Sequence, residues 1–198
     1  MVDPRTASLW GYRTLFLGLA ALIIFMGLLP LSALPSAWPL PDAVLGYFPD
    51  WLYPYDWPGF DLLLVLTLVW VLRRPDFVPL LLVALVFLVD DLLSFRPPGL
   101  WTAIVLLGTE FLRARESSTR ALPFWSEWVM VAMVVGAMSL SYRLILALFM
   151  VPQVALGAQL LYVLTTVAAY PVVASVTHYG LGLYRAAPGE VDPWGQRL

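Results

Sequence analysis

Long apolar runs, separated by short polar or proline-rich stretches, dominate the chain. A helix needs about 20 apolar residues to cross a hydrocarbon core roughly 30 Å thick. The shorter runs are expected to extend into their flanks or to lie in a locally thinned bilayer. The pattern therefore predicts an all-α membrane protein, a polytopic bundle of six transmembrane helices in a single domain, residues 1–183. The predicted spans are residues 12–34, 60–72, 77–93, 99–112, 125–149 and 154–183.

The composition supports this assignment and excludes several kinds of site. The 198 residues are 61% hydrophobic and only 12% charged, with a mean hydropathy of +0.84, whereas soluble domains are about 25% charged. The sequence contains no Cys and a single His, which excludes disulfides, thiol nucleophiles and multi-His metal centres. The net charge is −2, and the chain does not offer the clustered basic surface that nucleic-acid binding requires. We therefore expect no metal, no cofactor and no nucleic-acid partner.

Residues 35–59, between the first two predicted spans, are rich in proline and in aromatic residues. Prolines lack a backbone N–H and restrain the residue before them, so this stretch cannot form one continuous helix. It carries acidic residues and no Lys or Arg. Amphipathic rings are favoured at the membrane surface, so we expect a loop on the bilayer with Trp51, Tyr55 and Trp57 as candidate interface residues.

The distribution of basic residues orients the predicted spans. All eleven are Arg, and only Arg96 and Arg143 fall on the opposite side of the membrane from the others. Basic residues concentrate on the cytoplasmic side of membrane proteins. The pattern thus predicts that both termini, including a tail at residues 184–198, are cytoplasmic, and that the proline-rich loop lies outside.

Four charged residues near the outer ends of the spans are candidates for a site: Asp90, Asp91, Arg96 and Arg143. Adjacent carboxylates on a helix point about 100° apart, so the two Asp side chains are poorly placed to share one metal or one substrate atom. One Asp could face water while the other hydrogen-bonds the following loop. We favour a pairing of one carboxylate with Arg96 or Arg143, because a charge within an apolar run needs a partner.

Two further residues have structural interpretations. Asp61 precedes an apolar run and is expected to cap the start of a helix. Pro171 should kink or break the last span and free carbonyls that a neighbouring helix must satisfy. None of the motifs of nucleophilic, metal or nucleotide chemistry is present, so we expect no catalytic residue and no enzyme activity.

The segment LVDDLLSFRPPGLWT, residues 88–102, resembles the Asp-Leu-Leu-Ser-Gly-x-x-x-Gly stretch of MreD, the family of rod shape-determining membrane proteins of bacteria. The stretch from Asp91 to Ser94 and Gly99 fall on this motif, whereas Phe95 stands where the family usually has Gly. We expect that departure to change how the turn is built, with Pro97 and Pro98 stiffening it. The resemblance covers roughly residues 55–185.

The resemblance implies a six-helix bundle similar to the substrate-binding components of energy-coupling vitamin transporters. It also implies a non-enzymatic scaffold in the bacterial inner (cytoplasmic) membrane that supports peptidoglycan synthesis and rod shape. The partners it implies are MreC, the glycosyltransferase RodA with its class B penicillin-binding transpeptidase, MreB and RodZ, together with membrane lipid.

A second function stays open on the residues alone. The fold similarity and the four charged residues near the outer face are also compatible with a small-molecule-binding subunit of an energy-coupling-type transporter. Its site would be a cavity that is open to the outside and lined by the third and fifth spans.

Overall fold

The computed structural model describes residues 4–29, 59–119 and 123–181, and that part of the chain is entirely helical. The all-α prediction is confirmed over these residues. The α-helices are α1 (Pro4–Leu28), α3 (Leu62–Arg73), α4 (Leu80–Leu93), α5 (Leu100–Thr119), α6 (Phe124–Leu148) and α7 (Leu156–Leu181), and a short 3-10 helix, η4, spans Pro75–Phe77.

Three helices are long and apolar enough to cross a membrane: α6, α7 and the part of α1 from Leu9 to Leu28. This finding is consistent with a membrane protein. Helix α3 is apolar but has only 12 residues, which span about 18 Å at 1.5 Å per residue. Helix α5 extends seven residues past its predicted end, because Arg and Glu in its second half are good helix formers and need no apolar surroundings.

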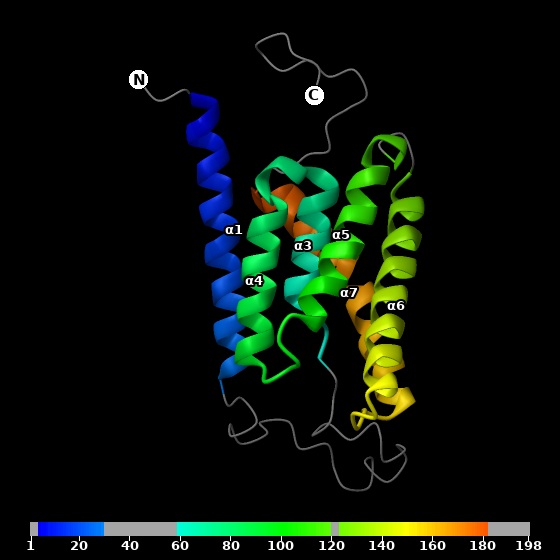
Figure 1. Ribbon diagram of the computed structural model, residues 1–198. Helices are drawn as coiled ribbons and strands as arrows, with labels where there is room; N and C mark the ends of the chain where they lie inside the picture. The colour runs from blue at the N-terminus through cyan, green and yellow to red at the C-terminus, as the bar shows by residue number, and fades with distance from the viewer. Residues whose placement is uncertain (1–3, 30–58, 120–122, 182–198) are drawn as a thin grey trace, which may run out of the picture.

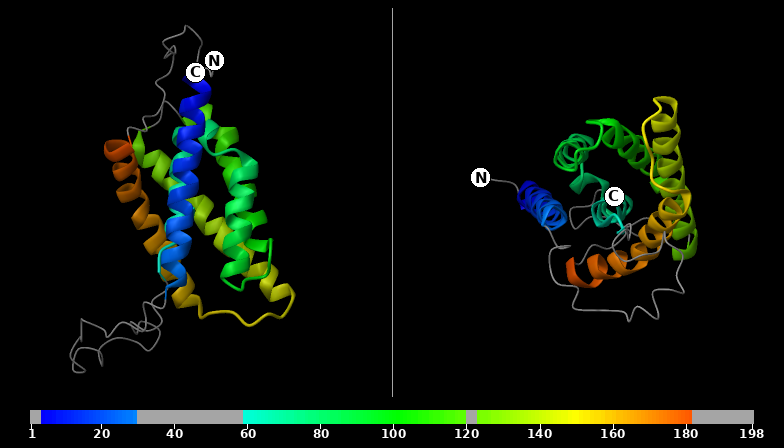
Figure 2. Two further views of the ribbon diagram at one scale, coloured as in Figure 1. Left: turned by 90° about the vertical axis from the view of Figure 1, so that its left-hand side faces the viewer. Right: turned by 90° about the horizontal axis from the view of Figure 1, so that it is seen from below.

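Helix α3 forms the centre of the bundle. Its residues 63–72 are all buried, which is the expected state of a helix that is apolar on every face. It packs against α7, α5 and α1, and the other helices surround it when the bundle is seen along its length (Figure 2). The indole of Trp70, fully buried in α3, lies 5.4 Å from the ring of Phe16 in α1.

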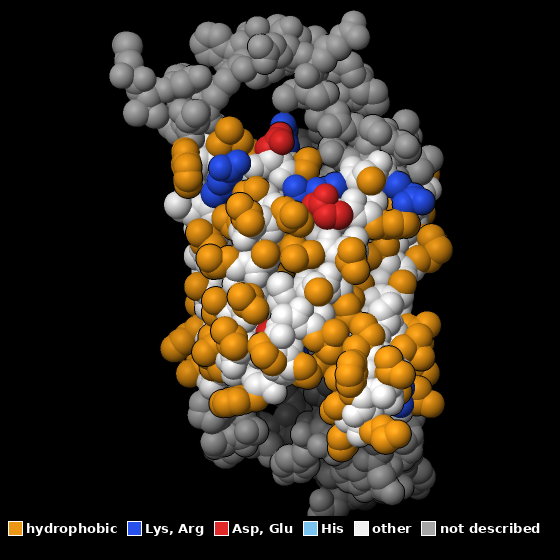
Figure 3. All heavy atoms as spheres, in the orientation of Figure 1, with side chains coloured by type: hydrophobic (Ala, Val, Ile, Leu, Met, Phe, Trp, Pro, Cys, Tyr) orange, Lys and Arg blue, Asp and Glu red, His pale blue; other side chains and the backbone are white. Residues whose placement is uncertain are grey.

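Successive helices run in alternating directions, so the bundle has two chemically different ends (Figure 1). We call the end where α1 begins and α7 ends the upper end, and the opposite end, where α3, α5 and α7 begin, the lower end. Charged side chains gather near the upper end and apolar ones cover the middle of the face shown in Figure 3. Arg96 and Arg143 belong to the lower end, since they lie near the ends of α4 and α6.

Helix α4 ends in a hydrogen-bonded turn that uses a left-handed residue. The Arg96 N–H donates to the Asp91 carbonyl at 3.1 Å, and Phe95 between them has a φ of +53°. This is the Schellman arrangement, in which the left-handed position is usually Gly. Phe95 thus adopts a backbone conformation that usually requires Gly.

The Phe95→Gly substitution is expected to raise the free energy of unfolding by about 0.5–1 kcal/mol. A left-handed backbone strains any residue with a Cβ, and the Phe95 side chain is 96% exposed, so its loss removes no core packing. Thermal unfolding of the purified protein in detergent measures the change. The control is Phe95→Ala, which removes the ring but keeps the Cβ and therefore the strain. An equal gain in both variants would contradict this explanation.

A candidate polar site at the lower end of the bundle

Asp91 joins the end of α4 to the start of α5. Its carboxylate is fully buried, and Oδ2 accepts hydrogen bonds from the Gly99 N–H at 3.1 Å, the Thr102 N–H at 3.1 Å and the Thr102 hydroxyl at 2.8 Å. Gly99 directly precedes α5 and has no side chain that could cap the helix, so a carboxylate from α4 supplies the cap. Asp91 therefore has a structural role in this turn.

Asp90 points to a different side of α4 and forms an ion pair. Its Oδ2 lies 3.4 Å from Nη1 of Arg96, which confirms the prediction that one of the two carboxylates pairs with an Arg. Arg143 takes other partners: its Nη1 donates to Oε1 of Gln159 at 2.6 Å and to the Val154 carbonyl at 3.0 Å. The reversal of the chain between α6 and α7 brings these acceptors to Arg143, which the local sequence does not reveal.

Asp61 caps α3 and also ties it to α7. Its Oδ1 accepts from the Leu64 N–H at 2.8 Å, as predicted for a helix start. The Tyr162 hydroxyl donates to Oδ2 of Asp61 at 3.0 Å, and the Asp61 N–H donates to the Thr166 hydroxyl at 3.2 Å. These contacts fix the lower end of the central helix against α7.

Pro171 lies inside α7, and the helix continues through it. Proline cannot donate to the carbonyl four residues earlier, which is that of Val167. The Trp128 indole N–H of α6 donates to this carbonyl at 2.9 Å. The helix is thus not broken, and the prediction that a neighbouring helix satisfies the freed carbonyl is confirmed.

A cavity of about 410 Å³ opens among these groups at the lower end, and we call it the lower cavity. The α4–α5 turn, the start of α5, the last turns of α6 and the start of α7 line it. Its walls carry two guanidinium groups, two amides and two phenols beside apolar side chains. The polar residues are Arg96, Arg143, Gln153, Gln159, Tyr142 and Tyr162, with Ser139 and the indole of Trp101 next to them.

Sequence reasoning placed Arg96 and Arg143 near this end but missed the other polar residues of the lower cavity. A signal for them exists on α7, where Gln159, Tyr162 and Thr166 recur at spacings of three and four and so share one helix face. Gln159 uses its amide within the wall, donating to the carbonyl of Ser139 at 2.9 Å and to its hydroxyl at 2.8 Å.

The arrangement can hold a ligand by hydrogen bonds and charge. Among the residues that the structure describes, no group of three or more His, Asp or Glu side chains could hold a metal ion. The remaining interface residues predicted from sequence, Trp51, Tyr55 and Trp57, lie outside the described residues.

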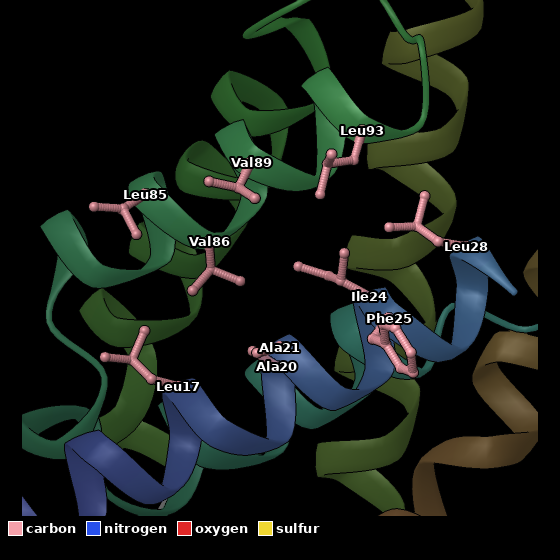
Figure 4. Close-up of a pocket in the computed structure, with 10 residues that line it drawn as sticks. All are labelled: Leu17, Ala20, Ala21, Ile24, Phe25, Leu28, Leu85, Val86, Val89 and Leu93. Atoms are coloured by element: carbon pink, nitrogen blue, oxygen red, sulfur yellow. The ribbon is translucent and has the colours of Figure 1, made fainter.

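A second hollow, of about 330 Å³, lies between α1 and α4. Figure 4 shows its side chains, which come from the two helices and are all apolar. Such a surface is suited to lipid chains or apolar side chains, but it has no group that would orient a polar ligand. The residues that face the hollow include Leu17, Ala20 and Ile24 on α1 and Leu85, Val86 and Val89 on α4.

Comparison with known proteins identifies no relative. No family model, no curated protein and no solved structure matches the chain.

Proposed function

We propose that the chain is a non-enzymatic scaffold of the cell-elongation machinery in the bacterial inner membrane, similar to MreD. One observation carries this proposal. The family motif has Gly at the two positions occupied here by Phe95 and Gly99, and both positions have positive φ, +53° and +84°. Positive φ is the backbone conformation that favours glycine. The backbone conformation at these two positions is therefore the one that the family's glycines would favour, which supports the proposal.

The proposed architecture has six transmembrane helices and both termini in the cytoplasm. The alternating helix directions support it, as does the concentration of Arg at the upper end, which would be cytoplasmic. Helices α3 and α4 are short for a span, with 12 and 14 residues. Helix α3 is enclosed by other helices, so its length need not match the thickness of the lipid bilayer.

In this proposal MreC is the direct partner, held by the outer loop at residues 35–59. RodA with its transpeptidase, MreB and RodZ are the wider assembly. The Arg-rich upper end would face anionic lipid, which attracts basic residues by about 1 kcal/mol each near the surface.

Replacing Trp51, Tyr55 and Trp57 together with Ala should weaken MreC capture about fivefold or more, because buried aromatic residues carry much of the binding energy of interfaces. Capture of purified MreC by the immobilised full chain measures the effect. Replacing the apolar Leu81 on the exposed face of α4 with Ala is the control and should leave capture unchanged. Unchanged capture by the triple variant would exclude the loop as the MreC site.

Affinity purification of the tagged chain from its native host in mild detergent, with mass spectrometry, tests the scaffold function itself. Recovery of MreC or of RodA with its transpeptidase is the expected result. Recovery of nucleotide-hydrolysing transporter subunits without the wall machinery would overturn it.

A second candidate function is that of a small-molecule-binding subunit of an energy-coupling-type transporter. The lower cavity favours it, because convergent polar groups in a concave site are what orients a ligand. A ligand that co-purifies in stoichiometric amount with the chain would support this function.

A further inference from the structure

The lower cavity contains a buried donor without a partner. Trp101, at the start of α5, is only 4% exposed, and among the described residues its indole N–H has no hydrogen-bond acceptor. Most buried polar atoms in proteins are paired, and an unpaired one costs about as much free energy as a lost hydrogen bond. The Trp101 ring packs edge-on against Tyr142 with centroids 5.4 Å apart, so the indole is held in place. The N–H is closed to solvent as the side chains stand, so an acceptor from outside the chain reaches it only when a side chain of the wall moves aside.

Arg143 supplies further donors on the same wall. Only its Nη1 bonds to described residues, namely Gln159 and the Val154 carbonyl. A guanidinium has five N–H donors in a rigid fork, so Nη2 and Nε stay available for a ligand. The bonds that Nη1 makes also hold the fork in one orientation, which lowers the entropy cost of binding.

Arg143 is a cation of the cavity wall without a carboxylate partner among the described residues. Arg96 and Arg143 line the cavity, and the nearby carboxylates already have donors: Asp61 bonds the Tyr162 hydroxyl and Asp91 bonds the start of α5. Asp90 pairs with Arg96 at 3.4 Å and so orients the Arg96 guanidinium. No carboxylate among the described residues pairs with Arg143 in the same way. Arginine forks match phosphate oxygens in geometry and bind them more strongly than neutral acceptors.

We propose that the lower cavity binds a phosphate group, held by Arg143, Arg96 and the Trp101 indole N–H. A phosphate has several oxygens that can accept from donors on different walls, and the lower end of the bundle is where lipid headgroups would meet the protein. A volume of about 410 Å³ accommodates a phosphate with a small polar substituent, while the tails of a lipid would lie outside. The phosphate can come from an anionic lipid headgroup or from a soluble phosphate ester. This inference rests on the second candidate function and is independent of the scaffold function.

Native mass spectrometry of the full chain in detergent tests the proposal with three probes. Phosphatidylglycerol presents the phosphate on a lipid, monogalactosyl diacylglycerol has similar tails without phosphate, and glycerol 1-phosphate is soluble. We expect the wild type to retain a phosphate-bearing probe and to bind the galactolipid at least about tenfold more weakly, in line with the strength of hydrogen bonds to charged groups. Retention of phosphatidylglycerol alone assigns the site to lipid, and retention of glycerol 1-phosphate assigns it to a soluble ligand.

Variants of the chain test which residues bind the phosphate group. Arg143→Gln should lower phosphate affinity about tenfold, and Trp101→Phe, which keeps an aromatic ring but loses the N–H, should lower it about threefold. The control is Arg74→Gln at the upper end, which should bind like the wild type. Equal binding by all variants, or equal retention of the galactolipid, would overturn the proposal. Trp101→Phe keeps the test decisive if Arg143→Gln does not fold. Recovery of a phosphate-free ligand would overturn this inference while supporting the second candidate function, and MreC capture reports separately on the scaffold.

Discussion

Replacing Asp91 with Ala should lower the free energy of unfolding by about 3 kcal/mol, because three donors converge on one buried carboxylate oxygen. The variant would leave the N–H groups of Gly99 and Thr102 and the Thr102 hydroxyl without their acceptor at a site closed to water. It would also remove a negative charge from the positive end of the α5 dipole. The loss combines a missing helix cap, typically worth about 1 kcal/mol, with buried donors left unpaired at about 1–3 kcal/mol.

Unfolding in detergent, followed by circular dichroism against temperature or denaturant, measures the Asp91 effect. The neighbouring variant Asp90→Ala is the matched control, since Asp90 pairs with the partly exposed Arg96 and its loss should cost under about 1 kcal/mol. Thr102→Val removes only one of the three donors and should have an intermediate effect. If Asp91→Ala and Asp90→Ala unfold alike, the carboxylate of Asp91 does not stabilise the α4–α5 turn.

The second large effect concerns the contact between Trp128 and the carbonyl that Pro171 leaves unpaired. Trp128→Phe should lower the free energy of unfolding by about 1–2 kcal/mol, because the Val167 carbonyl then loses the indole N–H at 2.9 Å. In a Pro171→Ala background, residue 171 regains an N–H that can bond to Val167 within α7. The same Trp128→Phe change should then cost less than about 0.5 kcal/mol.

A double-mutant cycle over these two positions separates the hydrogen bond from the packing of the indole. The expected interaction energy is about 1 kcal/mol, because the shared acceptor couples the two residues. Trp125→Phe provides a control, since Trp125 is largely exposed beside Trp128 and should not couple to Pro171. Additive effects of Trp128→Phe and Pro171→Ala would mean that Trp128 contributes only by packing.

Features that depend on neighbours in sequence were predictable. Asp61 was expected to cap a helix because the cap bonds to an N–H three residues later, and it does so with Leu64. The unpaired carbonyl near Pro171 follows equally from local covalent structure. The sequence did not reveal that Trp128 would satisfy it, because that residue is 39 positions away from Val167 and lies on another helix.

The candidate site was only partly accessible from the sequence. Arg96 and Arg143 stood out as charges among apolar residues, and the pairing of Arg96 with Asp90 spans only six positions. Gln159 carried only the weaker signal of its spacing from Tyr162 and Thr166, and Trp101 carried none, because amides and indoles are common near the ends of apolar helices. Their importance comes from the packing of α5, α6 and α7, which places them on one cavity.

The helical content followed from the sequence, because a long apolar run in an apolar environment leaves no backbone group unpaired when it is helical. Which polar side chains meet depends instead on the packing of the helices. Adjacent residues on a helix point about 100° apart, so whether Asp91 faces α5 and Arg143 faces α7 depends on how each helix is rotated in the bundle. That rotation is set by the packing of all the helices around α3, and no local pattern encodes it.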